Sequence, residues 1–123
     1  MKDPAGEANP ARPGPGLRLC AVEEIADPGA KSFRFRAESR LFAGFVVRSA
    51  GQVAGYVDSC PHACWPLGAM NDRYLTRDER HILCAGHGAL FTVDAGLCVA
   101  GPCYGERLTP WPVEVREGAV FTL

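Results

Sequence analysis

The sequence predicts an all-β domain, an antiparallel β-sandwich or barrel of about ten short strands. Short apolar runs, several alternating with polar residues, recur along the chain and are separated by turn-forming residues. No segment has an apolar stripe sustained over three helical turns. With 123 residues, 47% of them hydrophobic and 22% charged, the chain has a globular composition and enough length for one hydrophobic core.

The first 16 residues differ from the rest in composition. They hold four of the ten prolines and contain no aromatic or β-branched residue. Such a segment buries too little apolar surface to offset the entropy lost on ordering, so we expect residues 1–16 to be a disordered tail. Residues 17–123 are then expected to form a single domain.

Within this domain, strands are expected where a short run is apolar or alternates apolar with polar residues between turn signals. The expected strands are 17–25, 32–36, 42–48, 52–58, 81–84, 89–93, 97–100, 113–115 and 119–123. Asp27-Pro28-Gly29 ends the first strand, and Ser49-Ala50-Gly51, Asp94-Ala95-Gly96 and Glu117-Gly118 have the composition of tight turns. Residues 59–80 do not alternate, and a loop this long inside a compact domain usually has a function.

The charge balance excludes some classes of partner. Lys and Arg number 13, Asp and Glu number 14, and the net charge of −1 indicates neither a nucleic-acid nor an anionic-membrane partner. The chain shows no membrane-spanning run, no signal-peptide centre and no paired arginines, so we expect a cytoplasmic protein. Thiols stay reduced there, and the six cysteines therefore indicate a metal site or reactive thiols before disulfides.

The most informative residues form two short motifs, Cys60-Pro61-His62 and Cys84-Ala85-Gly86-His87. Each motif supplies one thiolate and one imidazole, and together they use two of the three histidines. One interpretation is a zinc site, although zinc fingers more often place two cysteines in one motif and two histidines in the other. A second is two buried thiols beside two ordinary histidines. A third is a 2Fe–2S cluster with two cysteines on one iron and two histidines on the other.

The paired motifs resemble the Rieske family, whose pattern is Cys-x-His followed by Cys-x-x-His. Further family landmarks are Pro66-Leu67, His87-Gly88-Ala89-Leu90-Phe91 and Gly101-Pro102. The resemblance covers residues 17–123. It implies a Rieske-like fold with a base (17–57 and 106–123) and a cluster-binding part (58–105) in which two loops face each other.

This resemblance also implies the cofactor and its ligands. One Rieske-type 2Fe–2S cluster is expected per chain, with Cys60 and Cys84 on the buried iron and with His62 and His87 on the outer iron. Family members with high potentials have an extra cysteine in each loop and a serine near the cluster. In this chain Ala85 and Gly86 lie between the second pair of ligands, and Ala89 is near the serine position. We therefore expect a potential at the low end, roughly −150 to 0 mV, as in ferredoxin members.

The implied function is a one-electron carrier of the low-potential ferredoxin type, with no catalytic residues of its own. A flavin-containing reductase is the expected donor, and an oxygenase or other oxidoreductase is the expected acceptor. The alternatives are the small Rieske-like subunit of a larger reductase and a zinc-bound structural module. A catalytic oxygenase would need two more histidines and a carboxylate for a mononuclear iron, and only His81 is left over.

The other cysteines and aromatic residues have ordinary explanations. Cys20 and Cys98 are expected to pack in the core as small apolar residues. Cys64 follows the first motif and Cys103 follows Gly101-Pro102, so a Cys64–Cys103 contact is conceivable, although spacing alone does not predict one. His81 is expected to be a half-exposed strand residue. Phe91 and Trp111 are expected to lie in the core.

Overall fold

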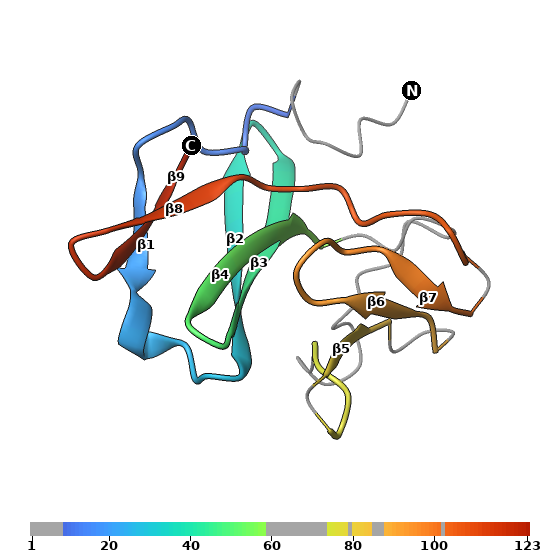
Figure 1. Ribbon diagram of the computed structural model, residues 1–123. Helices are drawn as coiled ribbons and strands as arrows, with labels where there is room; N and C mark the ends of the chain where they lie inside the picture. The colour runs from blue at the N-terminus through green and yellow to red at the C-terminus, as the bar shows by residue number, and fades with distance from the viewer. Residues whose placement is uncertain (1–8, 59–73, 79, 85–87, 102) are drawn as a thin grey trace.

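The computed structural model describes residues 9–58, 74–78, 80–84, 88–101 and 103–123. These residues form short strands and one short 3-10 helix (Figure 1). In chain order the elements are β1 (Arg18–Ala21), η1 (Val22–Glu24), β2 (Gly29–Ala37), β3 (Arg40–Ser49), β4 (Gln52–Val57), β5 (His81–Leu83), β6 (Leu90–Thr92), β7 (Cys98–Ala100), β8 (Val113–Arg116) and β9 (Ala119–Thr122). The all-β prediction is confirmed.

The strands pair into three antiparallel sheets, in the orders β1-β9-β8, β2-β3-β4 and β5-β6-β7. In Figure 1 the first two sheets lie together on one side of the molecule, and β5, β6 and β7 lie on the other. The last sheet is built from residues 81–100, the region that contains the second Cys–His motif. The first two sheets form the larger part of the fold, which is called the base below. The third, smaller sheet lies next to the predicted metal site.

The long hairpins of the base follow the expected pattern. In β2, Phe33 and Phe35 are half-buried while Arg34 and Arg36 are exposed, as the period-two alternation predicts. The predicted hairpin turns are also found: β3 and β4 are joined by Ala50 and Gly51, and β8 and β9 by Glu117 and Gly118. Both residues of each turn have positive φ, which suits the right-handed twist of the paired strands.

The expected first strand, 17–25, is wrong in its C-terminal half. The strand ends at Ala21, and residues 22–24 form the 3-10 turn η1. The backbone N–H of Ala21 donates a hydrogen bond of 2.8 Å to the Glu24 carboxylate, and the N–H of Ile25 donates to the Val22 carbonyl at 3.0 Å. This local turn competes with strand extension and places Ile25 in the core, where only 1% of it is exposed.

Residues 9–16 contact the base, although their composition predicts a disordered tail. Ala11 is buried against the core, and the Arg12 guanidinium lies 5.5 Å from the centroid of the Phe42 ring. The Thr122 hydroxyl donates to the Gly14 carbonyl at 2.7 Å, so this segment contacts the last strand as well. Contacts with the folded domain therefore reach further toward the N-terminus than composition indicates.

Trp111 is the centre of the base core and is 1% exposed. Phe33, Phe35 and Phe42 meet its indole edge-on, with ring centroids 5.3–6.3 Å away. Each such pair contributes about 0.5–1.5 kcal/mol beyond the burial of its area. Gly44 makes room for the ring, because a Cβ there would lie 2.5 Å from Cε3 of Trp111. The predicted core position of Trp111 is confirmed.

A second buried cluster joins the β2-β3-β4 sheet to the smaller sheet. Phe45 stacks on Tyr74 with ring centroids 4.4 Å apart, and the Tyr74 hydroxyl donates a buried hydrogen bond of 2.8 Å to Asp58. The Tyr56 hydroxyl donates to the Val93 carbonyl at 2.9 Å, just after β6. Aromatic packing and these polar contacts hold the smaller sheet against the base.

Candidate metal centre

Cys84 is the predicted metal ligand that lies within the described residues. Cys60, His62 and His87 lie outside them, as does Cys64. Cys84 directly follows β5, has 0% exposure and forms no disulfide. Ile82 is also 0% exposed, while His81 is half-buried. Because side chains alternate along a strand, Ile82 and Cys84 face the core and His81 faces the other way.

Backbone hydrogen bonds join Cys84 to the residues at the far end of the predicted ligand loop. The N–H of Cys84 donates to the Ala89 carbonyl at 2.9 Å, and the N–H of Gly88 donates to the Cys84 carbonyl at 2.9 Å. Gly88 has a φ of 73°, a conformation that glycine adopts without strain. These two bonds bring the ends of the predicted ligand loop together and hold the backbone of Cys84 in place.

The turn after β7 packs directly on this loop. Gly101 has a φ of 102°, and a Cβ there would lie 2.7 Å from Cα of Ala89. The turn is closed by bonds from the Tyr104 N–H to the Gly101 carbonyl (3.2 Å) and from the Glu106 N–H to the Cys103 carbonyl (2.8 Å). The glycine of the Gly101-Pro102 landmark therefore allows two backbone segments to approach each other beside the predicted ligand.

The surroundings of Cys84 fit the buried end of a 2Fe–2S cluster. Its thiol is shielded from water, and Ala89, Phe91 and Cys98 belong to the same buried cluster. A mixed-ligand 2Fe–2S site has thiolate ligands on one iron and imidazole ligands on the other, and a buried thiol suits the iron that is further from solvent. Ala89 is fully buried and has no hydroxyl to donate to a sulfide. Within the described part of the chain no group of three or more His, Cys, Asp and Glu residues could hold a metal ion, and three of the four predicted ligands lie outside that part.

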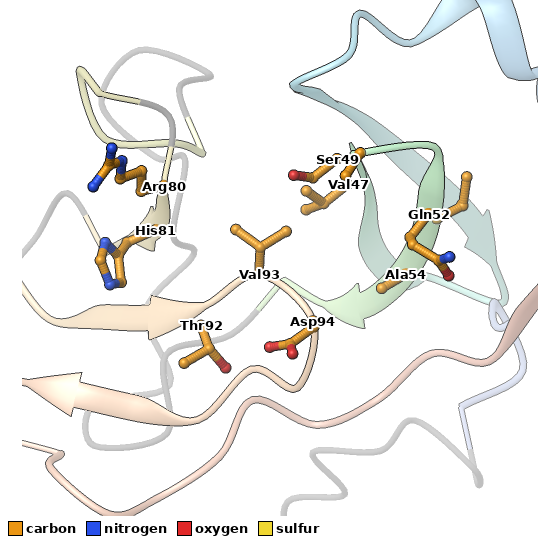
Figure 2. Close-up of a pocket in the computed structure, with 11 residues that line it drawn as sticks. Val47, Ser49, Gln52, Ala54, Arg80, His81, Thr92, Val93 and Asp94 are labelled. Atoms are coloured by element: carbon orange, nitrogen blue, oxygen red, sulfur yellow. The ribbon is translucent and has the colours of Figure 1, made fainter.

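His81 borders a cavity instead of lying in the core. The cavity has a volume of about 600 Å³ and lies between the β3–β4 hairpin and the ends of β5 and β6. In Figure 2 the side chains of Arg80 and His81 lie on one side, Ser49 and Gln52 lie across the cavity, and Val93 lies between them. The prediction that His81 is a half-exposed strand residue is confirmed.

The described cysteines are all buried. Cys20 and Cys98 are 2% and 1% exposed, which confirms that both pack in the core. One contact is not expected from the sequence: the thiol of Cys103 donates to Sγ of Cys98 across 3.0 Å. The Cys-x₄-Cys spacing is the sequence signal for this pair, but spacing without a turn geometry does not show that two sulfurs meet.

Two buried tyrosines have perturbed acidity. Burial, together with the negative charge of Asp94, raises the pKa of Tyr56 from 10.0 to about 12. Burial and the neighbouring Asp58 carboxylate raise the pKa of Tyr74 far above its ordinary value. Both hydroxyls therefore stay protonated at neutral pH and act as hydrogen-bond donors between the sheets.

No helix among the described residues has the length and the apolar character that crossing a bilayer requires.

Comparison with known proteins finds a family model and relatives that are similar to this chain. The family model described as Rieske [2Fe-2S] domain matches residues 17–115. The 3-phenylpropionate/cinnamic acid dioxygenase ferredoxin subunit of Photorhabdus laumondii is 27% identical over 105 residues, which are 85% of this chain and 90% of that protein.

Among solved structures, a complex of reduced oxygenase and oxidized ferredoxin of carbazole 1,9a-dioxygenase matches with a TM-score of 0.65 and 27% identity. The match covers 86% of this chain and 90% of the other. A carbazole-bound complex of an oxygenase variant and ferredoxin of the same system matches with a TM-score of 0.72 over 97% of this chain. This chain spans only 31% of that second chain, and at 18% identity the likeness shows the fold alone.

Proposed function

The chain belongs to the Rieske [2Fe-2S] domain family, and from this premise we propose that it is a one-electron carrier that delivers electrons to an oxygenase. Its donor is a flavin-containing reductase, and the chain itself makes and breaks no substrate bonds. The cluster, when bound, supplies reversible storage of one electron.

This proposal is supported mainly by the length over which the chain matches ferredoxin components. The chain covers 90% of a dioxygenase ferredoxin subunit and 90% of a chain in a solved oxygenase–ferredoxin complex. It covers only 31% of the chain in the other oxygenase complex. Similarity over nearly the full length of carrier proteins favours a carrier above a catalytic oxygenase.

We assign the ligands as two pairs. Cys60 and Cys84 hold the inner iron, and His62 and His87 hold the outer iron. The burial of Cys84 supports the inner position, since a fully shielded thiolate suits the iron furthest from solvent. The base then comprises residues 17–57 and 106–123, and the cluster-binding part comprises residues 58–105.

Residues of the chain have distinct tasks around this site. The Cys84–Ala89 and Gly88–Cys84 backbone bonds hold the second ligand loop closed. The buried cluster containing Phe91 and Leu108 shields the inner side from water. Ala89 has no side-chain hydroxyl that could donate a hydrogen bond to a cluster sulfur, as a serine there would. Without this donor the reduced state is stabilised less. This composition supports a potential of roughly −150 to 0 mV.

We place the carrier in the cytoplasm. Among the described residues, Cys20, Cys84 and Cys98 form no disulfide, which suits a reducing compartment.

The ligand assignment is tested by EPR of the dithionite-reduced protein, together with its iron and sulfide content. We expect two irons and two sulfides per chain and a rhombic signal whose average g-value lies below that of all-cysteine clusters. His87→Ala should abolish this signal. The matched control is His81→Ala, because His81 faces away from Cys84 and should leave the spectrum unchanged. A colourless, EPR-silent protein with one zinc would contradict the proposal.

Carrier function is tested by mixing the reduced protein with the oxygenase component of a carbazole 1,9a-dioxygenase as a surrogate acceptor. The visible absorption of the cluster reports reoxidation under anaerobic conditions. We expect reoxidation to be faster with the oxidised oxygenase than with the same concentration of an inert protein. Equal rates would contradict delivery to this class of acceptor.

A further inference from the structure

Two cysteines outside the predicted ligand set form a close pair of thiols. Cys98 belongs to β7, and Cys103 lies in the turn that follows it. Their Sγ atoms are 3.0 Å apart, only about 1 Å more than the length of a disulfide bond. Each residue is 1% exposed, and both belong to the buried cluster that contains Cys84.

The backbone holds the two sulfurs in this arrangement. The N–H of Cys98 donates to the Glu106 carbonyl at 2.8 Å, and the N–H of Gly105 donates to the Cys98 carbonyl at 3.0 Å. The N–H of Glu106 donates to the Cys103 carbonyl at 2.8 Å. These bonds return the chain from β7 onto itself, so the two cysteines meet as neighbours across a closed turn.

The hydrogen bonds of the thiols also order the pair. The Cys103 thiol donates to Sγ of Cys98, and the Cys98 thiol donates to the Ala100 carbonyl at 3.2 Å. Tyr104, the residue after Cys103, is 75% exposed. The turn that carries Cys103 therefore reaches the protein surface one residue away from this buried sulfur.

From this geometry we propose that Cys98 and Cys103 form an oxidation site that peroxide-class oxidants convert into an intramolecular disulfide. One sulfur attacks hydrogen peroxide, the O–O bond breaks, and a sulfenic acid and one water form. The second sulfur then attacks the sulfenic sulfur, which forms the S–S bond and releases a second water. Two thiols thus supply two electrons and two protons, and one peroxide becomes two waters.

A partner sulfur distinguishes this site from an ordinary buried thiol. Buried structural cysteines are usually inert, and redox-sensitive ones commonly have a resolving cysteine close by. Cys20 is equally buried at 2% exposure, and burial together with Glu24 raises the pKa of its thiol. Cys20 therefore serves as an internal control for reaction with peroxide at a buried thiol.

The test treats the oxidised holoprotein with one equivalent of hydrogen peroxide under anaerobic conditions. Thiols are then alkylated in denaturant, and digestion with trypsin and an Asp-specific protease gives the peptide 94–107, which holds only Cys98 and Cys103. We expect this peptide to resist alkylation and to weigh two hydrogen atoms less, while Cys20 is alkylated normally. Reduction before alkylation should restore both thiols.

The variant Cys98→Ser tests whether the second sulfur is needed. In Cys98→Ser, oxidation of Cys103 should stop at a sulfenic acid that dimedone traps, and no intramolecular disulfide should form. Iron content measured in parallel shows whether each variant still holds its cofactor. Alkylation of both cysteines after peroxide treatment, or a disulfide between Cys103 and Cys64, would overturn the proposal.

Discussion

The contact between Gly101 and Ala89 leads to a specific prediction about the cluster site. Substitution Gly101→Ala places a Cβ 2.7 Å from Cα of Ala89 and 3.3 Å from its backbone nitrogen. Backbone atoms cannot rotate away as a flexible side chain would. Relief of the clash must move the turn after β7 or the predicted ligand loop, in which the Ala89 carbonyl accepts the Cys84 N–H.

Gly105 supplies a matched control from the same turn. Gly101 and Gly105 have φ values of 102° and 88°, and nothing lies within 4 Å of a Cβ added at Gly105. At either position an alanine costs about 1–2 kcal/mol for its positive φ. Gly101→Ala carries a further cost of about 1–3 kcal/mol from overpacking against Ala89. We therefore expect losses of about 2–5 kcal/mol for Gly101→Ala and about 1–2 kcal/mol for Gly105→Ala.

Urea unfolding with iron release as a second signal measures both effects. The expected difference between the two variants shifts the urea midpoint by about 0.5–2 M. Gly101→Ala should also release iron at a lower urea concentration than Gly105→Ala, because its clash is with the predicted ligand loop. Equal midpoints and equal iron retention in both variants would refute the view that the turn holds this loop in place.

Three further predictions concern the rest of the fold. Ser39→Gly should raise the free energy of unfolding by about 0.5–1 kcal/mol, because Ser39 has a φ of 65°; a lower melting temperature would contradict this. Tyr74→Phe should cost about 1.5–3 kcal/mol in urea unfolding, since it removes the donor to Asp58, and an unchanged midpoint would show that this bond adds no stability. Above pH 10 the unfolded state loses the Tyr56 proton while the folded state keeps it up to a pKa of about 12, so stability falls as pH rises through this window. The free energy of unfolding of Tyr56→Phe should fall less steeply between pH 10 and 12 than that of the unsubstituted protein. Identical slopes for the two proteins would refute the raised pKa of Tyr56.

The sequence predicts most strands of this domain because their signals are local. Alternation in β2 and the turn residues Ala50-Gly51 depend on neighbours along the chain, and the structure confirms both. The expected strand 17–25 is too long because the Ala21 N–H donates to the Glu24 carboxylate and a local turn replaces the end of the strand. The apolar pattern of the sequence is the same with or without this turn, so the pattern does not reveal it. Residues 9–16 contact the base through Ala11, whose burial depends on a surface that forms only in the folded state.

By itself the sequence determined the family and the candidate ligands. Metal ligands require particular side chains at short spacings, and such spacings can be read directly from Cys60-Pro61-His62 and Cys84-Ala85-Gly86-His87. Only the tertiary structure decided which residues surround Cys84 and that Cys98 faces Cys103 across 3.0 Å. Whether two sulfurs meet depends on backbone hydrogen bonds and on the packing of Gly101 against Ala89. These contacts join different segments of the chain, so the residues adjacent in the sequence do not predict them.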